Sequence, residues 1–199
     1  SFLMNICYLW VMISLIHPSR GRPFKAKQTI DNWLSKSSKR NHIEHILSLD
    51  VDDRKLNSYK VFFKNALISN NSCVVEATNK GAKLANGDIL IYLSDDFDCH
   101  DKLQPFNKDV VTIPIINRQL YYKLGYLLNP LYKSMYVDQD LYWTCFNNSW
   151  IKEAPELKFQ HNHWANGKAK KDETYIRTDS FSSQGKHIYE QRKLANFPL

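Results

Sequence analysis

The chain has 199 residues, of which 43% are hydrophobic and 13% aromatic. This content excludes a disordered polypeptide and is sufficient for one α/β domain with a sizeable core. The formal net charge of +7 favours an anionic ligand, whether a nucleotide, a nucleic acid or a charged lipid surface. The four cysteines are scattered without paired spacing, which argues against a zinc cluster or a disulfide framework and favours a reducing compartment.

The apolar segment from Phe2 to Ile16 raises the question of a membrane-spanning or signal segment. Asn5 interrupts it, and it is shorter than the roughly 20 residues that a spanning helix needs. It has neither a basic flank nor a small-residue cleavage pattern. We therefore expect a lead-in and then a buried strand from Val11 to Ile16, in a soluble, cytoplasmic protein without a transmembrane segment.

The segment from His17 to Pro23 joins this strand to a helix. Pro and Gly are expected to end the strand, and Pro23 suits the first turn of a helix that runs to about Ser37. Small or apolar residues at helical spacing support this helix, namely Ala26, Ile30, Trp33 and Leu34. Arginine side chains and free N–H groups in such a loop suit a diphosphate, and a simple helix-capping turn is the alternative.

A second strand is predicted from Ile43 to Leu49, with an acidic cluster from Asp50 to Asp53 at its carboxyl end. The segment from Lys60 to Ile68 has no clear pattern. A helix is predicted next, and one of its faces is expected to pack under the central strand through Val74, Ala77, Gly81 and Leu84.

The most informative stretch runs from Asn86 to Asp98. A turn signal leads into an unbroken apolar run, Ile89 to Leu93, which predicts a strand buried on both faces of a mostly parallel sheet. The run stops at three carboxylates, Asp95, Asp96 and Asp98. Carboxylates this close repel one another unless a cation or hydrogen-bond donors offset the charge, so the pattern favours Mg²⁺ or Mn²⁺. An acidic loop that merely caps a turn is the alternative.

The remaining elements are predicted from shorter signals. Val110 to Ile116 is typical of an edge strand because it contains Pro114. Asn117 to Gly125 is predicted to be a short helix, and Tyr136 to Leu141 to open another with acids in its first turn. Basic residues 168–171 are read as a loop that could close over phosphates or as a solvated face, and residues 172–178 and 186–195 as terminal helices.

Leu157, Phe159, His161 and His163 alternate, so on a strand they would share one face. Imidazole is a frequent metal ligand, and both histidines are therefore candidates, with His163 preferred. Structural histidines of the core are the alternative.

A strand that ends in Asp-Asp-Phe-Asp resembles the metal-binding motif of GT-A fold glycosyltransferases, in the manner of the inverting family 2. The resemblance implies a three-layer α/β/α domain with a mostly parallel sheet, in which residues 1–100 bind the nucleotide and residues 103–199 bind the acceptor. That family usually has a longer segment after the motif. The short spacing here indicates either a minimal region or residues omitted near Lys102 and Leu103, and the omission is the preferred interpretation.

The resemblance also implies roles for individual residues. Metal ligands would be Asp96 and Asp98, with Asp95 beside them and a histidine from the C-terminal part. The catalytic base would be Asp138, with Asp140 in reserve. The nucleotide would contact residues of three further segments: Pro18, Ser19, Arg20 and Arg22 of the first loop, Asp50 and Asp52 at the base, and Asn79 and Gly81 of the Ala77-x-Asn-x-Gly element.

These implications predict a metal-dependent glycosyltransferase that moves a sugar from a nucleotide sugar, expected to be UDP-linked, to an acceptor hydroxyl with inversion. The acceptor (glycan, lipid-linked molecule or protein) and the oligomeric state are left open, and no nucleic-acid partner is expected. Two alternatives remain at this point. One is a nucleotidyltransferase, and the other is a non-catalytic module that binds glycans or nucleic acid.

Overall fold

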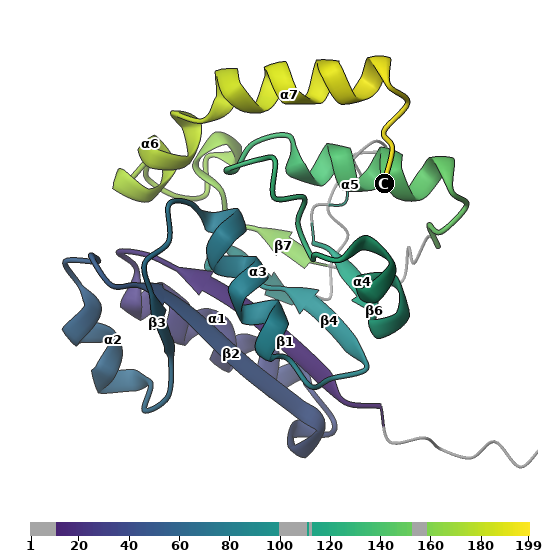
Figure 1. Ribbon diagram of the computed structural model, residues 1–199. Coiled ribbons are helices and arrows are strands. Elements are labelled where there is room, and N and C mark those ends of the chain that lie inside the picture. Colours follow the sequence, from purple (N-terminus) through teal and green to yellow (C-terminus); the bar gives the residue numbers. More distant parts are fainter. Residues whose placement is uncertain (1–10, 100–110, 112, 153–158) are drawn as a thin grey trace, which may run out of the picture.

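The computed structural model describes residues 11–99, 111, 113–152 and 159–199 (Figure 1). Several sequence-based predictions lie outside these residues. They are the lead-in that starts at Phe2, the omission near Lys102 and Leu103, the start of the edge strand at Val110, and the position of Leu157.

A five-stranded sheet forms the centre of the fold, in the order β3-β2-β1-β4-β6. The strands β1 to β4 are parallel to one another, and β6 at the edge is antiparallel to β4. The predicted mostly parallel sheet is therefore confirmed. The strands are β1 (Ile13–Ser19), β2 (Ile43–Asp50), β3 (Leu67–Ser69), β4 (Ile89–Tyr92) and β6 (Ile115–Asn117).

Helices cover both faces of this sheet, with α1 (Pro23–Lys36) behind it and α3 (Val74–Leu84) in front in Figure 1. Successive residues of a strand point to opposite faces. Leu15 accordingly belongs to the same core cluster as Ile30 of α1, whereas Ile16 clusters with Ala82 of α3. This alternation produces the expected three-layer α/β/α arrangement.

Two local predictions need correction. The strand β1 does not stop before His17 but runs through Pro18 to Ser19. This is possible because the ladder between β1 and β4 ends at Ile16, so Pro18 has a paired strand on one side only. The buried face of α3 includes Ala77 and Gly81 as predicted but not Leu84, which is 55% exposed.

The segment without a clear pattern, Lys60 to Ile68, overlaps the end of a helix, α2 (Leu56–Phe62), and most of the strand β3. Both are short, and Tyr59 is the one buried residue of α2. A single anchoring side chain gives no periodicity, which is why the sequence pattern missed this helix.

The second half of the chain builds a layer of helices over the carboxyl ends of the strands (Figure 1). The strand β7, which pairs with β5 in a separate two-stranded sheet, lies between this layer and the main sheet. The predicted helices after Asn117, Tyr136 and Asp172 are confirmed. These elements are α4 (Arg118–Leu124), α5 (Val137–Asn147), α6 (Glu173–Asp179), α7 (Ser182–Leu194), β5 (Phe97–Cys99) and β7 (Phe159–His161); 3₁₀ turns span Arg40–His42 and Trp164–Asn166.

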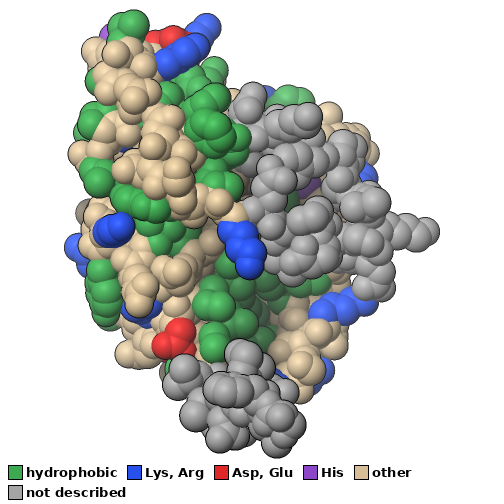
Figure 2. Space-filling model, turned by 90° about the vertical axis from the view of Figure 1, so that its right-hand side faces the viewer, with side chains coloured by type: hydrophobic (Ala, Val, Ile, Leu, Met, Phe, Trp, Pro, Cys, Tyr) green, Lys and Arg blue, Asp and Glu red, His purple; other side chains and the backbone are tan. Residues whose placement is uncertain are grey.

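The side of the molecule that carries α4 and β6 has hydrophobic side chains gathered along its middle (Figure 2). On these two elements Tyr122 is 72% exposed and Ile115 37% exposed. Among the described residues, no helix combines the length and the apolar character needed to cross a membrane.

Candidate functional site

A cavity of about 350 Å³ lies at the carboxyl ends of the central strands. Ser19, Asp50 and Tyr92, the last residues of β1, β2 and β4, line its floor. The start of α5 and one face of α6 close it from the other side. Ligands of open α/β sheets bind in this position, so the cavity is the candidate functional site.

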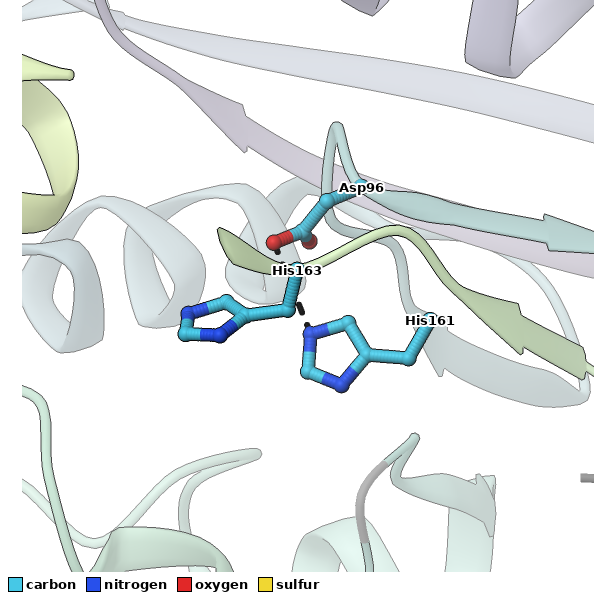
Figure 3. Close-up of side chains that lie close together, drawn as sticks. All are labelled: Asp96, His161 and His163. Atoms are coloured by element: carbon cyan, nitrogen blue, oxygen red, sulfur yellow. Dashed lines mark ion pairs between the residues drawn. The ribbon is translucent and has the colours of Figure 1, made fainter. Parts of the chain in front are cut away.

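One carboxylate and two imidazoles meet at this cavity (Figure 3). One ligand atom from each of Asp96, His161 and His163 lies within 4.8 Å of the others. These three residues are called the Asp–His–His trio below. The predicted C-terminal histidines are thus brought to the predicted acid, although His163 is not on the strand. The strand β7 ends at His161, and His163 caps the following 3₁₀ turn.

Hydrogen bonds fix the carboxylate of Asp96, which is only 5% exposed. Its Oδ1 accepts from the hydroxyl of Ser94 at 2.6 Å, and its Oδ2 accepts from the hydroxyl of Tyr175 at 2.9 Å. His161 Nε2 lies 3.5 Å from the same Oδ2. Burial raises the pKa of this carboxyl, but the interactions with His161, Ser94 and Tyr175 lower it more, so the pKa lies below its ordinary value.

The other two acids of the motif have different environments. Asp95 lies in the cavity floor, where Oδ1 is 2.9 Å from His17 Nε2 and Oδ2 accepts from the hydroxyl of Ser19 at 2.8 Å. Asp98 does not join the trio, and its Oδ2 accepts from Asn162 Nδ2 at 2.8 Å. The role of Asp98 as a metal ligand therefore remains a prediction without a geometric counterpart in this arrangement.

The two acids at the start of α5 point to different places. Asp138 lines the cavity, and burial raises the pKa of its carboxyl. Asp140 does not line the cavity and is 1% exposed. Its carboxylate accepts from Asn129, Tyr132 and Arg192, which ties α5 to α7. The geometry therefore favours Asp138 over Asp140 as the candidate base.

The loop after β1 is at the cavity as predicted, because Pro18, Ser19, Arg20 and Arg22 all line it. Arg22 is 7% exposed and forms two hydrogen bonds to Asp172 at 2.8 and 2.6 Å. Its guanidinium also stacks over a tyrosine ring of α6 at 3.9 Å. Arg22 thus holds α6 against the loop, in addition to facing the cavity.

Asp50 and Asp52, the two acids predicted to contact the base of the nucleotide, differ in exposure. Asp50 lines the cavity and is 7% exposed, whereas the side chain of Asp52 is 64% exposed. Both carboxylates accept from Arg20, with Nη1 2.7 Å from Asp50 Oδ2 and 2.5 Å from Asp52 Oδ1. Asp50 is therefore the better-placed candidate for contact with a ligand in the cavity.

The residues predicted from the helix element serve packing rather than the cavity. Asn79 donates to the carbonyl of Leu128 at 2.7 Å and accepts from the N–H groups of Leu127 and Leu128 at 3.0 Å. A Cβ on Gly81 would lie 3.0 Å from Ile16 Cγ2, so glycine lets α3 approach the sheet closely. Of this element, Ala77 lines the cavity.

The sequence patterns predicted the helix α6 but gave it no role in the site, although three of its side chains reach the floor of the cavity. Thr174 Oγ1 donates to the carbonyl of Arg20 at 2.8 Å, Tyr175 donates to Asp96, and Arg177 faces Asp50. The available signal was a tyrosine and an arginine two positions apart in a segment read only as a terminal helix.

No family model matches the chain, and no curated protein matches it. Solved structures do match. TarS from S. aureus in complex with UDP matches with a TM-score of 0.52 and 12% identity, over 69% of this chain and 55% of that one. The mannosyltransferase PcManGT from Pyrobaculum calidifontis, in complex with GDP-Man and Mn²⁺, matches with a TM-score of 0.53 and 11% identity, over 67% and 51%.

A mutant of Drosophila β1,4-galactosyltransferase 7, in complex with manganese, UDP-Gal and xylobiose, matches with a TM-score of 0.50. Its identity is 13%, over 84% of this chain and 79% of that one. The chain thus spans about half the length of the TarS and mannosyltransferase structures. At these identities the likeness concerns the fold, and the chain shares the GT-A type of α/β fold with glycosyltransferases.

Proposed function

We propose that this chain is a glycosyltransferase that uses a divalent metal to move a sugar from a nucleotide sugar to an acceptor hydroxyl with inversion. The observation that carries the proposal is the position of the Asp–His–His trio and Asp138 in one cavity at the carboxyl ends of the central strands. The fold likeness supports it, since neighbours were solved with UDP and with GDP-Man and Mn²⁺.

The chemistry of the trio suits Mn²⁺ better than Mg²⁺. Mg²⁺ strongly prefers oxygen ligands, whereas two imidazoles and one carboxylate suit a softer divalent ion. Burial lowers the pKa of His163, and a lower pKa favours the neutral ring that a metal requires. Its Nδ1 accepts from the N–H of Ala165 at 3.2 Å, which leaves Nε2 for a metal. When bound, Mn²⁺ would offset the negative charge that develops on the departing diphosphate.

The acceptor hydroxyl needs a group that takes its proton. Asp138 meets the two requirements for this role, because its carboxylate lines the cavity and burial brings its pKa upward toward the working pH. The first turn of a helix would by itself favour the ionised form, and burial opposes that effect. We assign Asp138 as the general base of a one-step displacement.

The donor would occupy the side of the cavity formed by the loop after β1 and by Asp50. In the proposed division of one domain, residues 1–100 bind the nucleotide and residues 103–199 bind the acceptor. Residues of α6 modify this division, since Tyr175 and Arg177 reach across to the donor side. A UDP-linked donor is the expected one.

Incubation with a panel of nucleotide sugars and Mn²⁺ tests the function. Release of free nucleoside diphosphate, dependent on Mn²⁺ and abolished in Asp96→Asn, is the expected result. Retention of phosphate on the product would indicate a nucleotidyltransferase instead. Binding of the donor without any turnover, with a full range of acceptors, would indicate a binding module.

A further inference from the structure

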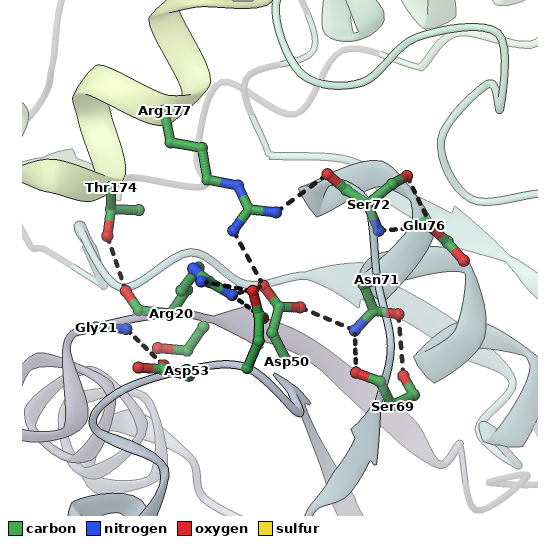
Figure 4. Close-up of polar contacts among 12 residues, drawn as sticks. Arg20, Gly21, Asp50, Asp53, Ser69, Asn71, Ser72, Glu76, Thr174 and Arg177 are labelled. Carbon is green, nitrogen blue, oxygen red and sulfur yellow. Dashed lines mark hydrogen bonds and ion pairs between the residues drawn. The ribbon is translucent and has the colours of Figure 1, made fainter.

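Arg177, from the C-terminal part of the chain, lies beside Asp50, whose carboxylate is proposed to contact the base of the nucleotide (Figure 4). Arg177 Nη2 donates to the backbone carbonyl of Ser72 at 3.1 Å, and Nη1 lies 3.7 Å from Asp50 Oδ2. Both Arg177 and Asp50 line the cavity. A hydrogen-bond donor and an acceptor are therefore held next to each other at one wall of the proposed nucleotide site.

Asp50 is the fixed member of this pair. Its Oδ1 accepts from Asn71 Nδ2 at 2.9 Å, and its Oδ2 accepts from Arg20 Nη1 at 2.7 Å. Arg177 is less constrained, because its side chain is 32% exposed and 3.7 Å exceeds the length of a hydrogen bond. Its Nη1 can thus donate to an acceptor on a ligand without losing a hydrogen bond to Asp50.

Apolar walls of the same cavity suit a flat ring. Val74 and Ala77 of α3 and Phe181, which precedes α7, line the same cavity and present apolar surface. Aromatic rings bind between apolar walls with polar groups at one edge, and that edge is then read by hydrogen bonds. The polar edge here would be Asp50 and Arg177.

The four bases fall into two classes at such an edge. Uracil and guanine carry a carbonyl oxygen next to a ring N–H, whereas cytosine and adenine carry an amino group next to a ring nitrogen that accepts. The first class matches Asp50 as acceptor and Arg177 as donor. The second class would place a donor against Arg177 and an acceptor against Asp50, and both mismatches would leave polar groups unpaired.

We propose that Arg177, together with Asp50, selects nucleotide sugars with a uracil or guanine base over those with a cytosine or adenine base. This inference rests on the proposed function, and it assigns the specificity of that site to a residue of α6. Arg177 acts on the choice of donor rather than on the transfer step.

Calorimetric titration with UDP, GDP, CDP and ADP, each with Mn²⁺, tests the inference on the intact chain. The wild type should bind UDP or GDP at least tenfold more tightly than CDP and ADP. Arg177→Met should weaken that UDP or GDP binding about tenfold, as expected for loss of a hydrogen bond from a charged donor, and leave CDP and ADP within twofold. Arg177→Lys, which keeps the cation, should retain part of the preference.

Arg54→Met is the matched control, because Arg54 is exposed and does not line the cavity, and it should bind all four nucleotides as the wild type does. An equal loss for all four nucleotides in Arg177→Met would overturn the inference, since a residue that only holds α6 or contacts the diphosphate has that effect. A wild type without the base preference would also overturn it. Failure to bind any nucleoside diphosphate would instead remove the proposed function.

Discussion

The hydroxyl of Tyr175 offers a direct test of the Asp–His–His trio, because it can be removed without removing the ring. It donates to Asp96 Oδ2 at 2.9 Å, while the ring stacks under the guanidinium of Arg22 at 3.9 Å. Tyr175→Phe keeps the stacking and removes the one hydrogen bond. Any change in metal binding then reports on how the carboxylate is oriented.

The size of the effect follows from the position of Asp96. Its carboxylate is 5% exposed, so water cannot replace the missing donor at full strength. Partners that orient metal ligands typically contribute 10- to 100-fold to metal affinity, or about 1.4–2.8 kcal/mol. We expect Tyr175→Phe to weaken Mn²⁺ binding by this factor while the protein stays folded at room temperature.

Titration of Mn²⁺ by calorimetry measures the effect, and Tyr122→Phe serves as the control because Tyr122 is 72% exposed and does not line the cavity. Unchanged Mn²⁺ affinity in Tyr175→Phe, together with no binding in Asp96→Asn, would show that the hydroxyl does not orient the ligand. Unchanged affinity in both variants would refute the trio as a metal site.

Three further outcomes are expected. Asp138→Asn should bind UDP and Mn²⁺ normally but transfer sugar about 10²–10⁴-fold more slowly, and near-normal transfer by this variant would contradict the assignment. In the wild type, the acid limb of the pH profile of kcat/KM should lie above the ordinary aspartate pKa of about 3.9, because only the ionised carboxylate accepts the proton and burial raises its pKa. Asp96→Asn should abolish Mn²⁺ binding in calorimetry, whereas Asp98→Asn should stay within a few-fold of wild type, and the reverse order would place the metal elsewhere. Asp140→Asn should lower the free energy of unfolding by about 3–5 kcal/mol in urea, since Arg192 would lose its buried partner, and a change below 1 kcal/mol would argue against that ion pair.

The fold could be predicted well where the signal is local. The apolar run at Ile89 predicted the central strand, and Gly125 predicted the end of α4, where it adopts a φ of +77°. The short elements α2 and β3 escaped, because each depends on contacts with distant residues rather than on its own pattern.

The sequence predicted the acidic residues of the candidate site better than the residues that contact them. Asp96 follows a recognisable strand, Asp138 lies in the first turn of a recognisable helix, and both line the cavity. The sequence placed Asp138 before Asp140 only through the resemblance to a known family, and the packing of α5 on α7 shows which of the two is engaged in an ion pair. Tyr175 and Arg177 escaped because their roles arise from contacts with residues about 80 to 130 positions earlier.

The contacts that hold α6 also bear on how the site comes into existence. Asp172 and Thr174 bind Arg22 and Arg20 across separations of 150 and 154 residues. Closing loops of this length is entropically costly and slow compared with the pairing of β1 and β2, 30 positions apart in register. The sheet can therefore be complete in a growing or refolding chain before the cavity has its second wall. Far-ultraviolet circular dichroism would report formation of the sheet and the helices, whereas nucleotide binding would report the packing of α6 against the loop after β1. During refolding, the binding signal should lag behind the circular dichroism signal.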